Sequence, residues 1–241
     1  MLLKKGSKGT DVVLLQKTLN EKGYNVGTAD GIFGSTTEQK VKDFQKDNKI
    51  TVDGVVGNGT WSLLVKGKSI TITAGHSNVD PGAVNGKYTE ANLVTELRNI
   101  VSAILKHKGY TVFTDGVGED NKSLNEAVKL IDKSKISIEL HLNASSNKEA
   151  KGIEALSQPK DKKLCQDLCR LTSKVLKTTI RGSDGGWKSE TSGQHTRLAY
   201  VSHGGIIFEG FFISNETELK TYLDNKDAFA MAIVEAIELN I

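Results

Sequence analysis

Three residues that can bind metal or move protons each stand at the end of a short apolar run. The runs have the composition of β-strands, and in open α/β sheets the functional crevice lies outside the carboxyl ends of the strands. The three side chains are therefore expected to meet in one crevice. They are His76 after residues 70–73, His141 after residues 136–140 and Glu209 after residues 205–208.

Such a set is suited to a catalytic zinc ion. Catalytic zinc takes three nitrogen or oxygen ligands from the protein and keeps one position open, and two histidines with one glutamate are a common set. His76 and His141 are the best histidine candidates, because small neighbours such as Gly75 and Ala144 leave room for a substrate. Several carboxylates are available as the third ligand, and spacing alone does not choose among them.

Alternating strand and helix patterns must position these residues. From residue 70 onward the alternation predicts an α/β domain, with a mostly parallel twisted sheet and helices on both faces. The expected strands lie near 70–74, 110–113, 136–141, 153–156 and 205–209, and the expected helices near 89–108, 123–134, 161–177 and 225–238.

The first 66 residues carry an internal repeat. Residues 29–37 and 52–60 each place Asp-Gly in a turn, followed by an apolar pair and by small polar residues that can cap a helix. Helical patterns lie before, between and after the two copies. We therefore predict a small three-helix binding module over residues 1–66, joined by a short linker to the α/β domain over residues 70–241.

Composition and charge exclude several classes of protein. With 241 residues, 37% hydrophobic and 25% charged, the chain reads as globular. The net charge of +3 lies in residues 1–66, which hold 10 lysines and 7 acidic residues. We interpret these lysines as ordinary solvated side chains and expect no nucleic-acid partner. Cys165 and Cys169 share the buried face of one expected helix and are predicted to stay reduced.

The N-terminus has no apolar core of a signal peptide, and no stretch approaches 18 apolar residues. We therefore expect synthesis in the cytoplasm without a signal peptide, and no insertion into a membrane.

Four motifs of the α/β domain follow one another in a recognisable order. They are Ala74-Gly75-His76 with Val79-Asp80-Pro81-Gly82-Ala83, then Glu90-Ala91-Asn92-Leu93, then His141-Leu142-Asn143-Ala144, then Glu209 with Phe212-Ile213-Ser214-Asn215. Together they resemble the zinc-dependent N-acetylmuramoyl-L-alanine amidases of the amidase-3 type, over roughly residues 70–240.

The front module resembles a type 1 peptidoglycan-binding domain, on residues 6–9, 30–34, 44–45 and 53–57 with Thr60-Trp61. Both halves of the chain thus imply peptidoglycan as partner, with no obligatory protein partner evident. Asp30, Phe33 and Trp61 are the candidate wall contacts, although Asp30 also suits a turn and Trp61 equally suits the core of the module.

The amidase resemblance implies that His76, Glu90 and His141 hold one Zn²⁺ per chain. Zinc would polarise the amide carbonyl and activate water, and Glu209 would carry the proton from that water to the departing L-alanine amine. Glu90 begins an expected helix, where the helix dipole also favours a carboxylate. Glu139 shares a strand face with His141, so it could orient that histidine, rival Glu90 for the metal, or only line the crevice.

Two positions depart from the family pattern. Thr73 replaces an aspartate, so a hydrogen bond from that side chain to a metal ligand is expected to be absent or altered. Phe211 replaces a glycine beyond Glu209 and is expected to narrow the site. The remaining candidates for contact with the ligands or the substrate are Asn143, Arg181 and Trp187, while His195 and His203 are interpreted as surface or loop residues.

The resemblance implies hydrolysis of the bond between N-acetylmuramic acid and L-alanine, and lysis of the wall. Two alternatives stay open: a zinc peptidase that cuts within the stem peptide, and a wall-binding protein without activity. We expect the protein to act at the wall after release by a holin or by lysis. A phage endolysin and a lytic enzyme of sporulation both fit the motifs.

Overall fold

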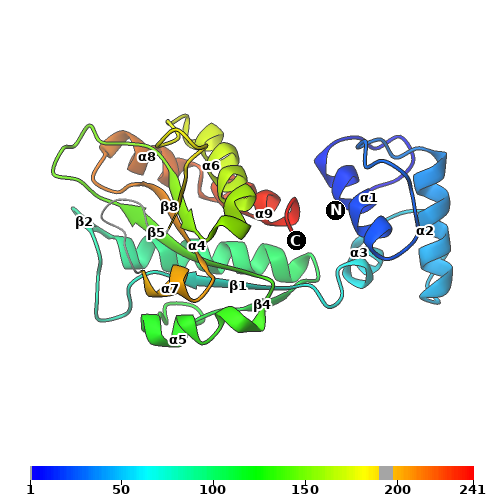
Figure 1. Cartoon of the computed structure of the whole chain (residues 1–241), viewed down its shortest axis with the longest axis horizontal. Coiled ribbons are helices and arrows are strands. Elements are labelled where there is room, and N and C mark those ends of the chain that lie inside the picture. Colours follow the sequence, from blue (N-terminus) through cyan, green and yellow to red (C-terminus); the bar gives the residue numbers. More distant parts are fainter. Residues whose placement is uncertain (1, 190–197) are drawn as a thin grey trace. The chain divides into compact units, whose positions relative to one another are not determined.

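Three helices form the core of the first unit in the computed structural model, which describes residues 2–189 and 198–241 (Figure 1). This unit comprises Met1–Lys68 with Lys106–Thr111, and the second unit comprises Ser69–Leu105 with Val112–Ile241. The helices of the first unit are α1 Thr10–Glu21, α2 Ser35–Asp47 and α3 Asn58–Leu64.

The internal repeat of the first unit is a repeated hydrogen-bond arrangement. The side-chain amide of Gln16 donates to Asp30 Oδ1 at 2.9 Å, and that of Gln45 donates to Asp53 Oδ1 at 2.8 Å. The carbonyl oxygen of each glutamine accepts from the glycine that follows its aspartate, at 2.9 Å in both copies. Each Asp-Gly turn is thereby tied to the helix that carries the glutamine.

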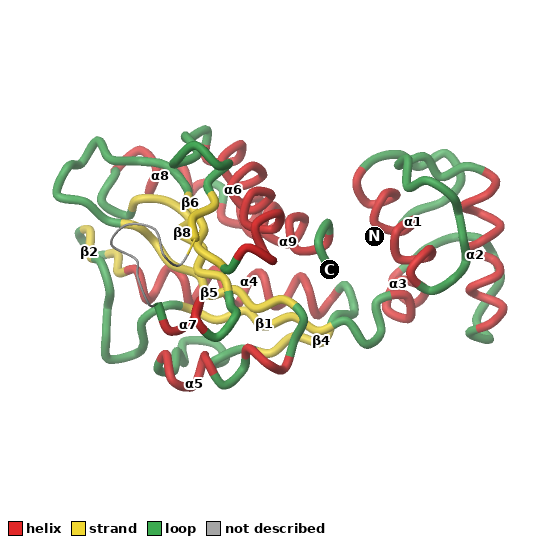
Figure 2. The backbone as a smooth tube through the Cα atoms, in the orientation of Figure 1, coloured by secondary structure: helices red, strands yellow, loops and turns green. Residues whose placement is uncertain are grey.

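A six-stranded sheet in the order β4-β1-β5-β8-β6-β7 organises the second unit (Figure 2). The pairs β1–β5, β5–β8 and β6–β7 are parallel, and β6 runs antiparallel to β8, which confirms the predicted mostly parallel sheet. The strands are β1 Ser69–Ala74, β4 Thr111–Phe113, β5 Ile136–Asn143, β6 Glu154–Ser157, β7 Trp187–Ser189 and β8 Ile206–Phe212, and a separate hairpin joins β2 Val84–Asn85 to β3 Tyr88–Thr89.

Helices cover both faces of this sheet (Figure 1). Phe208 stacks near Phe229 of α9, while its neighbour Ile207 belongs to a cluster with Tyr200 of α7 and Ala127 of α5. Successive strand residues point to opposite faces, so α9 and the pair α5 and α7 lie on opposite sides. The helices are α4 Glu90–His107, α5 Leu124–Val128, α6 Lys162–Leu176, α7 Ala199–Ser202, α8 Glu216–Asp224 and α9 Lys226–Glu238, with 3-10 turns at Ile131–Lys133 and Pro159–Asp161.

The predicted helix over residues 123–134 is divided into α5 and the 3-10 turn that follows it. Cys165 and Cys169 are free and buried, as predicted, and burial raises the pKa of the Cys165 thiol to about 12. None of the helices in the described part of the chain has both the length and the apolar character needed to cross a membrane.

Candidate metal centre and active site

His76, Glu90 and His141 come together from three elements. His76 follows β1 after Gly75, Glu90 begins α4, and His141 lies within β5. The Nε2 atom of His76 is 2.9 Å from Glu90 Oε2, and the Nδ1 atom of His141 is 3.0 Å from Glu90 Oε1. One potential ligand atom from each residue lies within 4.8 Å of the other two, so the cluster can hold a metal ion.

Each histidine has a second carboxylate on its other ring nitrogen. The Nδ1 atom of His76 is 2.9 Å from Asp80 Oδ2, and the Nε2 atom of His141 is 3.2 Å from Glu139 Oε2. A carboxylate in this position fixes the tautomer and the orientation of a metal-binding imidazole. Glu139 contacts the ring nitrogen of His141 that does not face Glu90. This arrangement favours a role for Glu139 in orienting His141 over a role as a metal ligand in place of Glu90.

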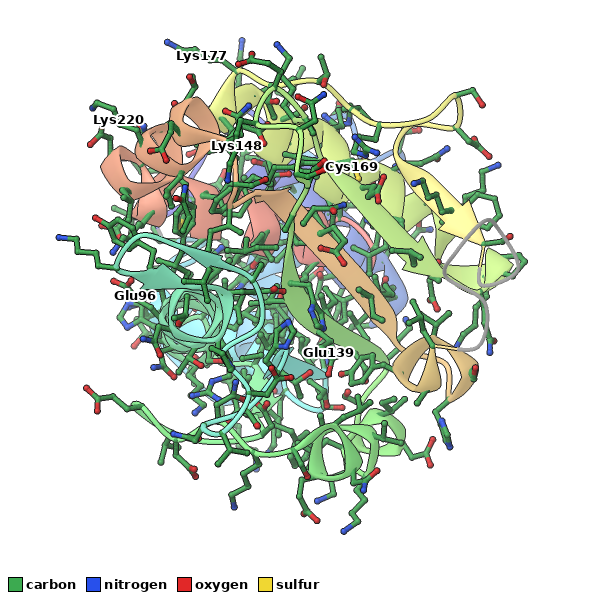
Figure 3. The ribbon with its side chains drawn as sticks, turned by 90° about the vertical axis from the view of Figure 1, so that its left-hand side faces the viewer. Glu96, Glu139, Lys148, Cys169, Lys177 and Lys220 are labelled. Atoms are coloured by element: carbon green, nitrogen blue, oxygen red, sulfur yellow. The ribbon has the colours of Figure 1, made fainter. Side chains whose placement is uncertain are left out.

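Figure 3 shows Glu139 inside the unit, whereas Lys177 and Lys220 extend outward. The side chain of Glu139 is 4% exposed. Asp80, by contrast, has a side chain that is 60% exposed. The two histidines therefore receive their carboxylate partners from a buried strand residue in one case and from an exposed loop residue in the other.

Two glycines allow the close approach of the histidine rings. A Cβ atom on Gly75 would lie 2.2 Å from the His141 ring, and one on Gly82 would lie 2.6 Å from the His76 ring. His76 itself has a φ of 66°, in the left-handed region that residues other than glycine rarely adopt. Such a conformation persists only where its surroundings hold it, and it is common at functional sites.

A buried ion pair holds the end of β1, and sequence reasoning missed it. The main-chain N–H of Ala74 donates to Asp115 Oδ2 at 3.2 Å, and Asp115 pairs with Arg98 at 3.0 Å. Thr73, which replaces the family aspartate, donates instead to the hydroxyl of Tyr200 at 3.2 Å. The carboxylate at this strand end thus comes from a distant loop, and only its partners in space reveal it.

Glu209 lies inside β8 and not at its end, in register with His141 on β5. Register partners on neighbouring strands project from the same face of a sheet, so this carboxylate lies beside the histidine cluster. Its Oε2 atom is buried and has no hydrogen-bond partner within residues 2–189 and 198–241. Burial raises the pKa of Glu209 to about 7.

The pKa of Glu90 is lowered, in contrast to that of Glu209. Burial alone would raise it, but hydrogen bonds from His141 and His76 lower it to about 2. The hydrogen bond to Glu90 raises the pKa of His76, and hydrogen bonds to Glu139 and Glu90 outweigh burial and raise that of His141. Glu90 thus stays ionised and can offer its negative charge to a cation.

A cavity of about 330 Å³ opens beside these groups. His76, His141 and Glu209 line its polar side, and Leu124, Leu198 and Ile207 line its apolar side. A small amide substrate can therefore meet both a cation site and a proton acceptor in a partly dry space.

Phe211 does not narrow this cavity, so that prediction was wrong. Gly210 follows Glu209 directly, and the ring of Phe211 is fully buried, 4.7 Å from the ring of Tyr222. The bulk of Phe211 fills the core between β8 and α8.

Asn143 and Arg181 meet at Glu154, a residue that the sequence analysis did not single out. Asn143 Nδ2 donates to Glu154 Oε1 at 3.1 Å, and Arg181 Nε donates to Oε2 at 2.7 Å. Trp187 lies on β7, where its Nε1 atom donates to Ser157 Oγ at 3.0 Å. A glutamate inside a predicted apolar strand was the available signal, because a buried charge needs partners.

The candidate wall contacts of the first unit need correction. Phe33 and Trp61 are each 1% exposed and pack in the core of the module, where they have no surface to offer a ligand. Asp30 Oδ1 accepts hydrogen bonds from the side-chain amide of Gln16 and from the main-chain N–H of Ile32, as is typical of an aspartate in a turn. His195 lies outside the described residues, and exposed His203 donates from Nδ1 to the carbonyl of Ala199 at 2.7 Å.

An α/β sheet that carries a His-Glu-His cluster beside a buried carboxylate is typical of metal-dependent hydrolases. Residues 70–239 match the family model for N-acetylmuramoyl-L-alanine amidase, and residues 8–64 match that for a peptidoglycan binding domain. The chain belongs to the N-acetylmuramoyl-L-alanine amidase family.

Several known proteins are similar to parts of this chain in sequence or structure. A crystal structure described as an N-acetylmuramoyl-L-alanine amidase from Neisseria meningitidis is 51% identical, with a TM-score of 0.66, and covers 71% of this chain and 94% of that one. The germination-specific N-acetylmuramoyl-L-alanine amidase of Bacillus subtilis is 29% identical over 180 residues, 66% of this chain and 72% of that protein.

A spore cortex-lytic enzyme of Bacillus cereus is 37% identical over 65 residues, which are 27% of this chain and 25% of that enzyme. The chain therefore spans about a quarter of the length of this curated relative.

Proposed function

We propose that the protein is a zinc-dependent amidase that hydrolyses the bond between N-acetylmuramic acid and L-alanine in bacterial peptidoglycan. The observation that carries this proposal is the position of Glu209 beside the His76-Glu90-His141 cluster. Glu209 is register-matched to His141, and its Oε2 atom has no hydrogen-bond partner in the described residues. Membership of the amidase family and the match of residues 8–64 to a peptidoglycan binding domain support the same polymer as substrate.

The residues of the cluster fit a zinc ion. Two imidazole nitrogens and one carboxylate oxygen are a common zinc set and leave a position open for chemistry. His76, Glu90 and His141 would hold the ion, and Asp80 and Glu139 would orient the two histidines. Bound zinc supplies Lewis acidity, which polarises the amide carbonyl and makes water more acidic.

Glu209 would move the proton in this reaction. In its ionised form it accepts a proton from the attacking water, and in its protonated form it donates that proton to the departing amine of L-alanine. Burial raises the pKa of Glu209 to about 7 in the site without a metal ion, and a bound cation would lower that pKa and favour the ionised form that accepts the proton. The apolar wall of Leu124, Leu198 and Ile207 would limit access of bulk water.

The front module would hold the enzyme on the polymer that the second unit cuts, so that wall lysis follows from repeated cleavage. Phage endolysin and lytic enzyme of sporulation remain two settings for this activity. Action at the wall after release by a holin or by lysis stays a prediction.

Digestion of purified walls tests the proposal. The wild type should clear a wall suspension and expose new L-alanine amino termini with intact muramic acid. Glu209→Gln should reduce the rate by about 10² to 10⁴-fold while zinc content is unchanged. Glu235→Gln, on α9, is a matched control that should behave as the wild type.

The alternatives have different outcomes in the same assay. New termini between amino acids would show a peptidase of the stem peptide and not an amidase. Wall binding without any cleavage by the zinc-loaded wild type would identify a binding protein. Unchanged lysis by Glu209→Gln would contradict the role given to that residue.

A further inference from the structure

His76 has a strained main-chain conformation in the turn after β1. Its φ of 66° lies in the left-handed region, which is disfavoured for residues that carry a Cβ atom. The segment that follows packs little against the rest of the chain, because Asn78, Val79 and Asp80 are exposed. Such a conformation persists only where surrounding contacts hold it. Those contacts must therefore come from another part of the fold.

Asn121 contacts the chain on both sides of His76. Its side-chain Nδ2 atom donates to the main-chain oxygen of Gly75 at 3.0 Å. Its main-chain oxygen accepts from the main-chain N–H of Asn78 at 3.0 Å, and its main-chain N–H donates to Asn78 Oδ1. One residue is thus hydrogen-bonded to the residue before His76 and to the second residue after it.

The Asn121 side chain is buried and is held through its donor. The residue is 4% exposed, and its Oδ1 atom has no hydrogen-bond partner in residues 2–189 and 198–241. Gly75 has little freedom to move, since a Cβ atom there would lie 2.2 Å from the His141 ring. A shift of Gly75 would therefore change the spacing between His141 and His76. The amide of Asn121 fixes this spacing at Gly75.

The loop that carries Asn121 is anchored to the helix that carries Glu90. Arg98 of α4 is fully buried, and its Nη2 atom donates to the main-chain oxygens of Gly118 at 3.1 Å and Asp120 at 2.8 Å. Arg98 lies about two helical turns after Glu90. Hydrogen bonds thus run from α4 through this loop to the turn after β1.

We propose that Asn121 is a positioning residue that holds His76 in its zinc-binding conformation before the ion arrives. This inference rests on the zinc site of the proposed function. Asn121 would act through the main chain of Gly75 and Asn78, whereas Asp80 acts on the imidazole ring itself. A ligand that is already in place loses less conformational freedom when it binds.

Asn121→Asp tests this role, because it keeps the shape of the side chain and replaces only the donor by an oxygen. Zinc-loaded protein is mixed with an excess of chelator, and the rate of zinc release is measured. The variant should release zinc about 10 to 100-fold faster than the wild type, the size of effect usual for groups that orient a ligand. The visible spectrum of the cobalt-loaded variant should also change, since its bands depend on coordination geometry. Both readouts come from metal-loaded molecules only, so they do not depend on the folded fraction of the sample.

Asn99→Asp is the matched control. Asn99 Nδ2 donates to the main-chain oxygen of Gly118 at 2.7 Å, so this substitution removes the same kind of donor from the same loop, and not the one that contacts Gly75. The control should keep the wild-type release rate and cobalt spectrum. Zinc release from Asn121→Asp at the wild-type rate, with the wild-type cobalt spectrum, overturns the positioning role even if that variant is less stable to heat.

Asn78→Ala covers the case in which Asn121→Asp does not fold. Asn78 is exposed, and its side chain contacts the same loop at the main-chain N–H of Asn121 and at the main-chain oxygen of Glu119, the latter at 3.0 Å. This variant should also release zinc faster than the wild type, and an unchanged rate overturns the proposal. A wild type that does not retain zinc overturns the proposed zinc site and this inference with it, whereas a zinc-loaded wild type with unaltered variants overturns this inference alone.

Discussion

Glu90 and Glu209 are the same amino acid in two buried places of one active face, and the fold treats them in opposite ways. Glu90 lies close to both histidines and accepts from the main-chain N–H groups of Ala83 at 3.1 Å and Leu142 at 2.9 Å. Glu209 Oε2 finds no partner in the described residues. The pKa values diverge accordingly, to about 2 and about 7.

The difference teaches that burial raises the pKa of a carboxyl group that lacks hydrogen-bond donors, as in Glu209, and that hydrogen bonds can outweigh this effect, as in Glu90. A glutamate that stays charged suits the binding of a cation, and a glutamate that titrates near neutral pH suits proton transfer.

The largest expected effect comes from the same substitution at both places. Glu90→Gln and Glu209→Gln should each reduce amide hydrolysis by at least about 10² to 10⁴-fold. Zinc should be lost from Glu90→Gln, because a neutral amide is a poor ligand, and should be retained in Glu209→Gln. Elemental analysis of the dialysed variants, beside a kinetic assay, makes the measurement. Equal zinc loss in both variants would contradict the assignment of Glu90 as a zinc ligand and Glu209 as a proton carrier.

The next effect concerns the carboxylates behind the histidines. Asp80→Asn and Glu139→Gln should each weaken zinc binding by about 10 to 100-fold, as is usual for partners that orient a ligand. Competition with a chelator measures the affinity, and Asp132→Asn in the 3-10 turn is the control. Complete loss of zinc from Glu139→Gln, as in Glu90→Gln, would instead make Glu139 a ligand.

The pH dependence separates the two glutamates without any mutation. Glu209 must be ionised to accept a proton, so kcat/KM should fall about tenfold per pH unit on the acid side. The pKa of about 7 belongs to the site without metal, and a bound cation favours the ionised form, so the midpoint of the fall should lie below pH 7. Zinc content measured across the same range should stay constant while the activity falls. Parallel loss of zinc and activity would attribute the fall to protonation of His76 and His141, whose pKa values are raised.

The smallest expected effect is electrostatic. Glu154 contributes a negative charge beside Glu209 and so helps to raise its pKa. Glu154→Gln should move the acid limb of kcat/KM to lower pH, by less than about one unit. Glu235→Gln, far from the site in the sequence, should leave the limb in place. A shift to higher pH would show that Glu154 does not act on Glu209 through its charge.

Several elements were predictable because their signal is local. The apolar periods at 70–74 and 89–108 correspond to β1 Ser69–Ala74 and α4 Glu90–His107 within one residue at each end. β7 Trp187–Ser189 was not among the expected strands, since three residues are too few to show a period. The interpretation of Phe211 failed because the register between β5 and β8 shifts between His141 and Asn143, and the Phe211 ring packs against Phe229 of α9 and not on the face of Glu209.

For the site, the sequence determined which chemistry was available, since His76, His141 and Glu209 stand beside apolar runs whose carboxyl ends meet in a parallel sheet. Motif resemblance alone pointed to Glu90. The tertiary structure decided which ring nitrogen faces which acid, with Asp80 beside His76 and Glu139 beside His141. It also decided that Asp115 accepts from the main chain at the end of β1 and that Glu154 is the register partner of Glu209. The physical reason is that strand and helix periods arise from near neighbours in the chain, whereas pKa values and metal-binding geometry depend on groups that are close only after folding.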